Sequence, residues 1–153
     1  MKQSLLIDSE PVDIPEHHKF KQSWRWPHAI EYFFAMMISS LSLHVCCGRS
    51  SLGDIRLDID RDSARTIAGD MRSLPFADNI FDWVFGDWPW KMNYFQRWRP
   101  FYEMVRVCKI GGRIIINATW IPFSKQAVLE ELYVRCDGPF KLASVICVFR
   151  KVS

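Results

Sequence analysis

A short stretch with two indoles, a carboxylate and a cation stands out as a group that could do chemistry. It reads GDWPWK, covers residues 86–91, and directly follows the apolar run FDWVF of residues 81–85. The Asp87 carboxylate can accept hydrogen bonds, and Trp88 and Trp90 offer flat apolar surfaces on either side of Pro89. Two interpretations stay open at this point. The tryptophans pack in a core, or they form a surface for a planar ligand.

The residues that follow interleave positive charges with aromatic rings. Tyr94, Phe95 and Trp98 lie among six basic side chains that face a single acid, Glu103; the basic residues are Lys91, Arg97, Arg99, Arg106, Lys109 and Arg113. This combination favours a strand of nucleic acid, whose phosphates attract cations and whose bases stack on rings. The alternative is that Arg106 and Lys109 lie on the solvated face of an amphipathic helix, while Phe95 and Trp98 pack under a sheet.

Apolar periodicity indicates the elements that position these groups. Helical spacing headed by Pro27 predicts a helix over residues 27–40, and Pro100 starts a second helix over 100–108, with Gly111 and Gly112 ending that segment. Short apolar runs predict strands at 42–46, 54–59, 66–69, 81–86 and 113–118. Two more strand-like runs flank the turn signal at 137–139 and predict an antiparallel hairpin. Strands alternating with helices are typical of an α/β domain with a mainly parallel sheet.

Length and composition fit one globular domain. The chain has 153 residues, of which 49% are hydrophobic, and its formal charge of +3 does not by itself indicate nucleic-acid binding. We expect an N-terminal arm over 1–26 and a single domain over 27–153. Five cysteines without C-x-x-C spacing predict neither disulfides nor a metal site and favour a cytoplasmic protein. The most apolar stretch, 29–47, contains too many polar residues for a membrane span.

Four segments of the chain resemble the class I S-adenosylmethionine-dependent methyltransferases. They are LHVCCGRS (43–50), RLDID (56–60), GDMRSLPFADNIFDWVFGD (69–87) and EMVRVCKIGGRIII (103–116). The last two are the most specific, because an LPF-x-D-x-x-FD segment is followed by VRV-x-K-x-GGR. The resemblance implies a Rossmann-like, mainly parallel seven-stranded sheet with a closing antiparallel hairpin, and S-adenosylmethionine as the cofactor.

In such a fold the cofactor lies beyond the carboxyl ends of the strands. The resemblance implies that the turn after the first strand approaches the methionine part, that Asp58 accepts from the ribose hydroxyls, and that Asp70 faces the adenine. The full set of cofactor-binding residues expected on this basis is Cys46, Cys47, Gly48, Arg49, Asp58, Asp70, Met71 and Asp87. The chain departs from the family at Cys46 and Ser50, where glycines are usual, and at His44, where an acid is usual.

Two connections are too short for the helices that this family usually has. Residues 48–53 separate the first two predicted strands and residues 60–65 the next two, whereas a parallel crossover normally takes about a dozen residues or more. We therefore expect a minimal form that lacks the helices after strands one and two. Helix 27–40 would cover one sheet face, and the arm, a second copy of the chain or a partner subunit would cover the remainder.

The resemblance extends to nucleic-acid amino-methyltransferases, in which a motif [DNS]-P-P-[YFW] ends the fourth strand. Residues 87–90 match it at three of four positions, with Trp88 in place of the proline whose fixed φ presents its carbonyl rigidly. It implies catalytic roles for Asp87, Trp88, Pro89 and Trp90. The carboxylate and the Trp88 carbonyl accept from an exocyclic amine of adenine or cytosine, Pro89 fixes their geometry, and Trp90 stacks on the base.

RNA or DNA is then an expected partner. Two alternatives stay open. The chain is a methyltransferase of the same fold that acts on small molecules or proteins, or it is a non-catalytic methyltransferase-like binding subunit.

Overall fold

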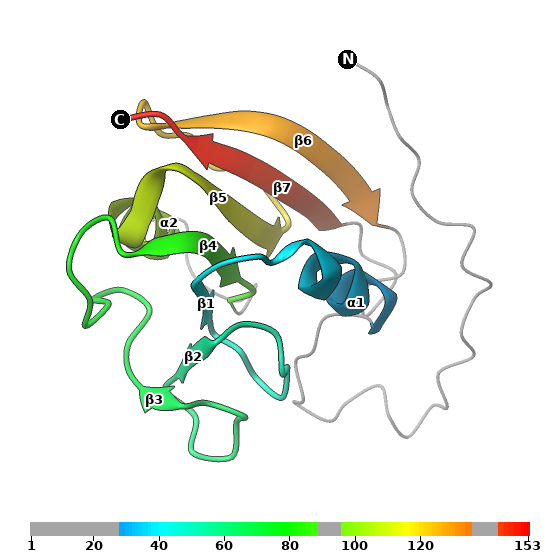
Figure 1. Ribbon diagram of the computed structural model, residues 1–153, viewed down its shortest axis with the longest axis vertical. Coiled ribbons are helices and arrows are strands. Elements are labelled where there is room, and N and C mark those ends of the chain that lie inside the picture. Colours follow the sequence, from blue (N-terminus) through cyan, green and yellow to red (C-terminus); the bar gives the residue numbers. More distant parts are fainter. Residues whose placement is uncertain (1–27, 89–95, 136–143) are drawn as a thin grey trace.

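One mixed β-sheet forms the centre of the molecule (Figure 1). The computed structural model describes residues 28–88, 96–135 and 144–153. The sheet has the strand order β3-β2-β1-β4-β5-β7-β6. The elements are α1 (His28–Met37), β1 (Ser42–Val45), β2 (Ile55–Asp58), β3 (Ile67–Ala68), β4 (Phe81–Gly86), α2 (Trp98–Val107), β5 (Cys108–Ala118), β6 (Ala127–Arg135) and β7 (Ser144–Lys151).

The topology confirms the predicted fold class. Strands β3, β2, β1, β4 and β5 are mutually parallel, and β7 joins antiparallel to both β5 and β6. This is a Rossmann-like α/β sheet closed by an antiparallel hairpin. The predicted arm over 1–26 lies outside the described residues, so the proposed boundary at residue 27 stays a prediction.

Two apolar layers bury the two faces of the sheet. Side chains of α2, such as Phe101 and Met104, pack against β1, β4 and β5 on one face. On the other face Phe34 of α1 packs with Phe85 and Ile115. Figure 1 shows α1 in front of the sheet and α2 behind it. Each described helix therefore covers one face.

Helix α1 is shorter than the predicted helix over 27–40 and buries less of its apolar surface than the spacing indicated. Phe34 is buried, but Phe33 and Met37 are exposed, and Tyr32 and Met36 are 68% and 70% exposed. A lone helix on a wide sheet contacts it along one narrow stripe. The remaining apolar side chains of α1 therefore stay on the surface.

The two short connections contain no helix, as predicted, and Arg56 holds them together. Residues 46–54 join β1 to β2, and residues 59–66 join β2 to β3. The Arg56 side chain donates to the carbonyl oxygens of Ala64 (2.8 Å) and Gly53 (3.2 Å), one in each connection. Leu52 fills the sheet face beside Phe34 and Phe85 where a crossover helix would otherwise lie. The Arg56 guanidinium thus links the two connections, and Leu52 covers apolar surface of the sheet in the absence of a helix.

The two most specific sequence segments form one hydrogen-bonded network. Arg106 of α2 donates to the carbonyls of Leu74 and Phe76 and pairs with Asp78 and Glu103. The alternative that Arg106 simply lies on a solvated helix face does not hold, because its guanidinium donates to five acceptor atoms of the protein. Lys109 belongs to β5 and pairs with Asp82.

Strand β5 begins at Cys108, five residues before the predicted strand, and includes Gly111 and Gly112, which were expected to end the preceding helical segment. A Cβ on Gly112 would lie 2.9 Å from the carbonyl oxygen of Asp82, and Gly111 has a φ of +83°. These glycines lie where the pairing of β5 with β4 is irregular, between Cys108, which aligns with Phe81, and Arg113, which aligns with Trp83.

Candidate functional site

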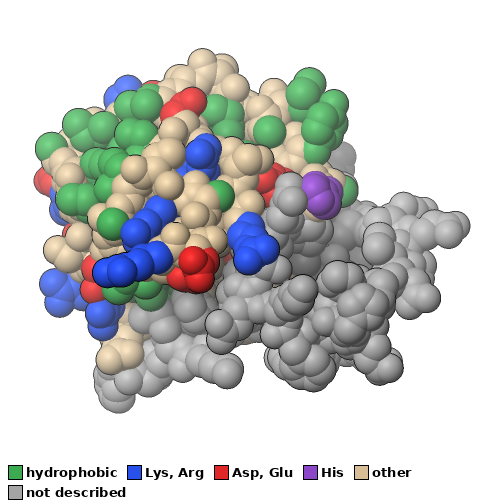
Figure 2. Space-filling view, turned by 90° about the horizontal axis from the view of Figure 1, so that it is seen from below, with side chains coloured by type: hydrophobic (Ala, Val, Ile, Leu, Met, Phe, Trp, Pro, Cys, Tyr) green, Lys and Arg blue, Asp and Glu red, His purple; other side chains and the backbone are tan. Residues whose placement is uncertain are grey.

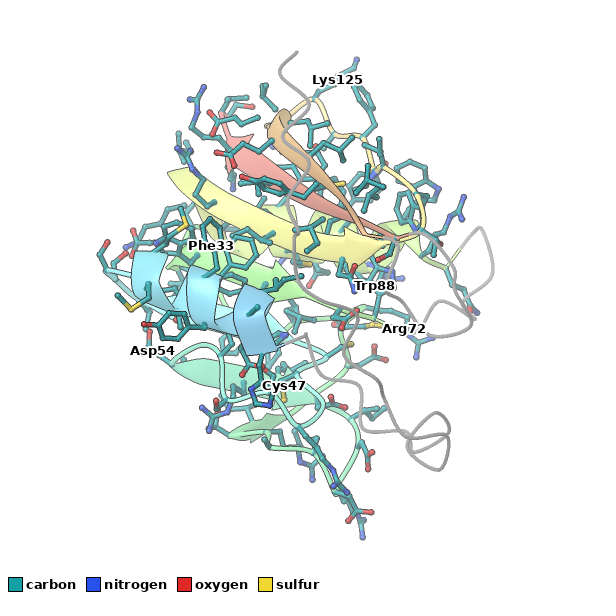
Figure 3. The ribbon with its side chains drawn as sticks, turned by 90° about the vertical axis from the view of Figure 1, so that its right-hand side faces the viewer. Phe33, Cys47, Asp54, Arg72, Trp88 and Lys125 are labelled. Carbon is teal, nitrogen blue, oxygen red and sulfur yellow. The ribbon has the colours of Figure 1, made fainter. Side chains whose placement is uncertain are left out.

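The carboxyl ends of four neighbouring parallel strands bring the predicted site residues to one edge of the sheet. Val45 of β1 aligns with Gly86 of β4, and Gly86 aligns with Ile116 of β5, so the residues that follow these three lie side by side. Asp58 ends β2 on the other side of β1. Figure 3 looks onto this side of the molecule, where Cys47, Arg72 and Trp88 are labelled. The edge is the position in which an open α/β sheet binds ligands.

The turn after β1 is bonded to Asp58. Cys46 and Gly48 both have left-handed φ angles, +55° and +52°. The Gly48 N–H donates to Asp58 Oδ2 at 2.9 Å, and Asp58 Oδ1 accepts from the Asp60 N–H at 2.9 Å. A carboxylate offers about four acceptor positions, so capacity remains for two hydroxyl donors. Arg49 of the same turn is exposed.

Asp70 and Met71 lie along the same edge but are engaged with neighbours. The Arg72 guanidinium pairs with Asp70 at 2.7 Å, and this contact holds the pKa of the carboxyl below its usual value. Met71 lies against Cys46, whose thiol donates to the methionine sulfur at 3.1 Å. An adenine amine approaching Asp70 would therefore share the carboxylate with Arg72.

Asp87 is the most enclosed acid of the edge, with 8% of its surface exposed. Its backbone N–H donates to the Val45 carbonyl at 3.4 Å, and its Oδ1 accepts from Asn117 Nδ2 at 3.2 Å. Both neighbouring strands thus fix the position of the carboxylate. The sequence analysis did not identify Asn117, although a polar residue directly after the apolar run III (114–116) is a signal by which it could have been identified.

Trp88 packs in the core, which answers the question about this indole. It is 3% exposed, and its ring lies 6.4 Å from that of Trp120. A Cβ on Gly86 would lie only 2.9 Å from the Trp88 ring, so the glycine makes room for the indole. Burial of the side chain anchors the backbone that follows Asp87. Pro89 and Trp90, the other two residues of the motif, lie outside the described residues.

Most of the described basic residues that suggested nucleic acid have partners within the protein. Arg106, Lys109 and Arg113 each pair with a carboxylate. Arg99 donates to the Arg72 carbonyl, and Arg97 stacks over the Trp120 ring at 4.7 Å. Figure 2 shows blue and red side chains interspersed on the face that it presents. Lys91, Tyr94 and Phe95 lie outside the described residues.

Trp98 and Trp120 form an aromatic pair beside the buried Trp88. Their ring centroids are 4.6 Å apart. Both rings are partly exposed. They therefore offer aromatic surface at the end of the sheet where β4 and β5 finish.

The buried thiols and the histidine of the site are not reactive groups at neutral pH. Burial raises the pKa of Cys46 well above its usual value, and that of Cys47 to about 11. Burial also raises the pKa of Cys108 and of Cys147 to about 12. Desolvation lowers the pKa of His44 to about 4, and its Nδ1 lies 3.2 Å from the Leu52 carbonyl oxygen. We therefore assign these groups to packing.

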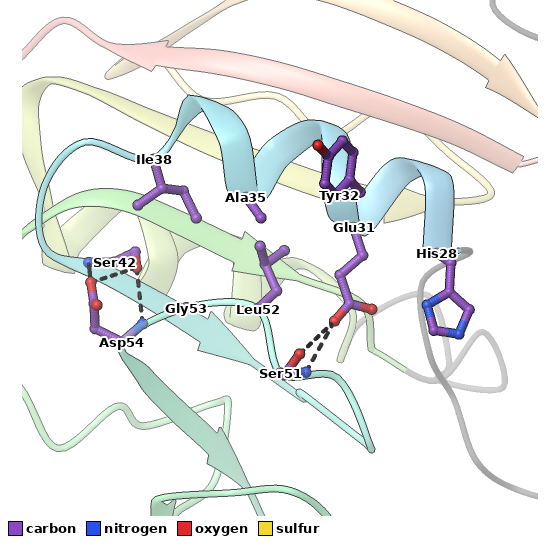
Figure 4. A pocket seen from close by; sticks show the side chains of 10 residues that line it. All are labelled: His28, Glu31, Tyr32, Ala35, Ile38, Ser42, Ser51, Leu52, Gly53 and Asp54. Carbon is purple, nitrogen blue, oxygen red and sulfur yellow. Dashed lines mark hydrogen bonds between the residues drawn. The ribbon is translucent and has the colours of Figure 1, made fainter.

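A separate recess of about 440 Å³ lies between α1 and the connection that precedes β2 (Figure 4). Its polar walls are hydrogen-bonded to one another. Glu31 accepts from the Ser51 N–H and hydroxyl, and Asp54 accepts from the Ser42 N–H and hydroxyl. None of the predicted site residues lines the recess. It lies at the amino ends of β1 and β2, away from the edge that gathers the acids.

Within the described residues, His, Cys, Asp and Glu side chains form no group of three that could hold a metal ion. The same part of the chain contains no helix that is long and apolar enough to cross a membrane.

The geometry and the sequence lead to the same family. Residues 35–116, more than half of the chain, match the family described as Methyltransferase domain. No curated protein sequence matches the chain significantly.

Solved structures share the fold at low sequence identity. PH0226 protein from Pyrococcus horikoshii OT3 has a TM-score of 0.62 at 15% identity, over 90% of this chain and 99% of that one. N-methyltransferase NodS from Bradyrhizobium japonicum WM9, in complex with S-adenosyl-L-homocysteine, has a TM-score of 0.64 at 9% identity, over 82% and 86%.

TrmN from Thermus thermophilus has a TM-score of 0.62 at 14% identity, and the match covers 81% of this chain but only 48% of TrmN. The chain therefore spans about half the length of that relative. With its seven-stranded sheet, its acids at the carboxyl edge and its match to the family over residues 35–116, the chain belongs to the class I S-adenosylmethionine-dependent methyltransferase domains.

Proposed function

We propose that this domain transfers a methyl group to an amine, and specifically to the exocyclic amine of adenine or cytosine. The observation that carries the proposal is the buried Asp87 carboxylate, held at the end of β4 by Asn117 and by the β1 backbone. A buried acceptor in the ligand-binding edge suits an N–H donor. NodS, which shares the fold, is by its name an N-methyltransferase.

The residues of the edge fit S-adenosylmethionine. Asp58 keeps acceptor capacity for the ribose hydroxyls beside the two backbone N–H groups that it already binds. The turn from Cys46 to Arg49 would lie along the methionine part, and Asp70 with Met71 beside the adenine. When bound, the cofactor supplies a methyl group, whose bond to sulfur breaks as the bond to the acceptor nitrogen forms, and departs as S-adenosylhomocysteine.

Asp87 would prepare the acceptor. An amine attached to a heteroaromatic ring is a poor nucleophile because its lone pair is delocalised into the ring. The Asp87 carboxylate and the Trp88 carbonyl would each accept an N–H, which favours pyramidal nitrogen and directs the lone pair toward the methyl group. After transfer the nitrogen carries one proton too many, and the adjacent carboxylate can pass it to water. The neutral methylamine then leaves.

The Trp88 indole would hold the backbone carbonyl in place, as proline does in the related motif. Proline restricts φ, whereas Trp88 restricts its backbone through a side chain that is 3% exposed. Trp90 would stack on the base, at a strength of roughly 1–3 kcal/mol, and Pro89 would set its direction. The roles of these two residues come from the sequence motif alone.

A small-molecule amine is the second candidate acceptor. The observation that favours it is the internal pairing of Arg106, Lys109 and Arg113, which leaves fewer cations for a phosphate backbone. The aromatic surface of Trp98 and Trp120 would suit either acceptor, because it requires only a planar group.

Mass spectrometry of nucleosides tests the proposal. RNA and DNA are incubated with the protein and deuterated-methyl S-adenosylmethionine, and we expect labelled methyladenosine or methylcytidine. Asp87→Ala should reduce the label at least about 100-fold while S-adenosylhomocysteine still binds. Asp82→Asn is the matched control, since Asp82 lies at the opposite end of the same strand and pairs with Lys109. A blank with intact cofactor binding would reject the nucleic acid and direct the search to small amines.

We further propose that a second chain covers the exposed apolar side of α1. Tyr32, Phe33, Met36 and Met37 form this surface. A chain of a Haloferax volcanii complex with the Trm112 methyltransferase activator shares the fold, with a TM-score of 0.53 at 12% identity over 74% of this chain and 82% of that one. Analytical ultracentrifugation distinguishes a second copy, which gives a dimer that Met36→Glu dissociates, from a different partner, which leaves a monomer.

A further inference from the structure

Among the buried side-chain atoms of the described residues that make no hydrogen bond, two lie at the edge that holds Asp87. They are Asn117 Oδ1 and Ser144 Oγ. Asn117 is 4% exposed and Ser144 is 1% exposed. A buried polar atom that makes no hydrogen bond destabilises the folded protein, so such atoms are rare and require a reason.

The strand register places these two side chains on one face of the sheet. Asn117 of β5 aligns with Ile146 of β7, so their side chains point to the same side. Ser144 precedes Ile146 by two positions in the same strand and shares that side. Ile146 packs in the apolar layer of α1, which identifies the face. Asp87 continues β4 on the other flank of Asn117, and the three polar side chains follow one another across β4, β5 and β7.

The hydrogen bond to Asp87 determines what Asn117 can still do. Its Nδ2 group must face the carboxylate, because a carboxylate accepts hydrogen bonds, and this orientation turns Oδ1 away as an acceptor. Asp87 and Asn117 thus present two acceptor groups side by side. The Ser144 hydroxyl can donate. An apolar residue of similar shape would fill either position at lower cost, so packing does not explain these two residues.

We propose that Asn117 and Ser144 bind the methyl acceptor together with Asp87 and select an amidine edge, in which a primary amine stands next to a ring nitrogen with a lone pair. In this arrangement Asn117 Oδ1 takes the place of the Trp88 carbonyl as the second acceptor, so the amine donates its two hydrogens to Asp87 and Asn117, and the ring nitrogen accepts from Ser144. Adenine and cytosine carry this edge. Hypoxanthine and uracil carry the reverse edge, with a carbonyl beside an N–H, and would face unpaired acceptors. The inference rests on the proposed amine methylation and adds two binding residues to it.

Calorimetric titration of the full chain with four nucleotides tests this inference. AMP, IMP, CMP and UMP are each titrated in the presence of S-adenosylhomocysteine. We expect AMP to bind about tenfold or more tightly than IMP, or CMP to bind about tenfold or more tightly than UMP. Ser144→Ala and Asn117→Leu should abolish this preference. Thr119→Val, at an exposed position just beyond β5, is the control and should leave it unchanged.

The variants also separate a binding role from a structural one. Ser144→Ala removes an unpaired hydroxyl, so the free energy of unfolding should stay the same or rise while the nucleotide preference is lost. If Asn117→Leu fails to fold, Ser144→Ala decides the question alone. Equal binding of both nucleotides in each pair, no binding of any, or a preference that survives Ser144→Ala overturns the inference. Methylated nucleobases found together with any of these results would leave the proposed function standing.

Discussion

The Asp87 carboxylate owes its position to contacts that each come from a different strand. The β1 backbone accepts its N–H, and Asn117 of β5 donates to its side chain. The Trp88 side chain then packs in the core, so the backbone beside Asp87 has little room to move. At the scale of single residues, the site therefore also depends on neighbours that hold it in place, such as Gly86, which makes room for the Trp88 indole.

Replacement of Gly86 by alanine tests how tightly Trp88 is packed. The added Cβ would lie 2.7 Å from the Met104 sulfur and 2.9 Å from the Trp88 ring, which forces both side chains to move. Overpacking of this kind costs about 1–3 kcal/mol, so urea denaturation should show a free energy of unfolding lower by that amount. Unchanged stability would mean that the Trp88 indole is free to shift.

The buried imidazole of His44 predicts a loss of stability in mild acid. Its pKa is lowered from 6.5 to about 4 in the folded protein by desolvation. Between these values the unfolded chain binds a proton that the folded chain does not, so the free energy of unfolding falls as the pH falls through this window. The loss reaches roughly 3 kcal/mol near pH 4.

Denaturation at a series of pH values measures this effect. In His44→Gln the decline between pH 6.5 and pH 4 should be shallower than in the unaltered protein. The same slope in both proteins would assign the acid sensitivity to other groups.

At the scale of elements, the short crossovers depend on Arg56. Its side chain donates to carbonyl oxygens of both connections. We expect Arg56→Met to lower the free energy of unfolding by about 1–3 kcal/mol, because those carbonyls lose a charged donor. Hydrogen exchange should speed up at the Ala64 N–H, which bonds to the Gly48 carbonyl. Arg49→Met, an exposed change in the first connection, is the control and should alter neither quantity.

The sequence allowed the strands and the fold class to be predicted because short apolar runs and family segments mark them. It also predicted that residues 46–54 and 59–66 contain no helix, since neither is long enough. It could not predict that Arg56 bonds to both connections, because the sequence around an arginine in a strand does not indicate which carbonyl oxygens it will contact. The binding roles that we propose for Asn117 and Ser144 were not predicted either. Their significance depends on the pairing of β5 with β7, which joins residues distant in the chain.

At the scale of the whole molecule, cofactor binding should raise thermal stability. A ligand at 100 times its Kd stabilises a protein by about 2.7 kcal/mol, which for a domain of this size corresponds to roughly 5–10 °C in Tm. We expect S-adenosylhomocysteine to produce such a shift in a thermal denaturation experiment. Asp58→Ala should remove the shift, because the ribose hydroxyls lose their acceptor. A shift that persists in Asp58→Ala would place the ribose elsewhere.

The exposed apolar side of α1 also belongs to this scale. The face with α1 leaves four large apolar side chains exposed, which explains why a second chain is expected there. The cytoplasmic location stays a prediction from the cysteine pattern.

The four described cysteines allow local opening of the structure to be followed by their rates of alkylation. Cys46 and Cys47 lie in the turn after β1, whereas Cys108 and Cys147 lie within the sheet. The buried thiols of Cys47, Cys108 and Cys147 react with an alkylating reagent only when the surrounding structure opens, whereas Cys46 is partly exposed. The order in which these thiols become alkylated would therefore show whether the turn after β1 opens before the central strands do.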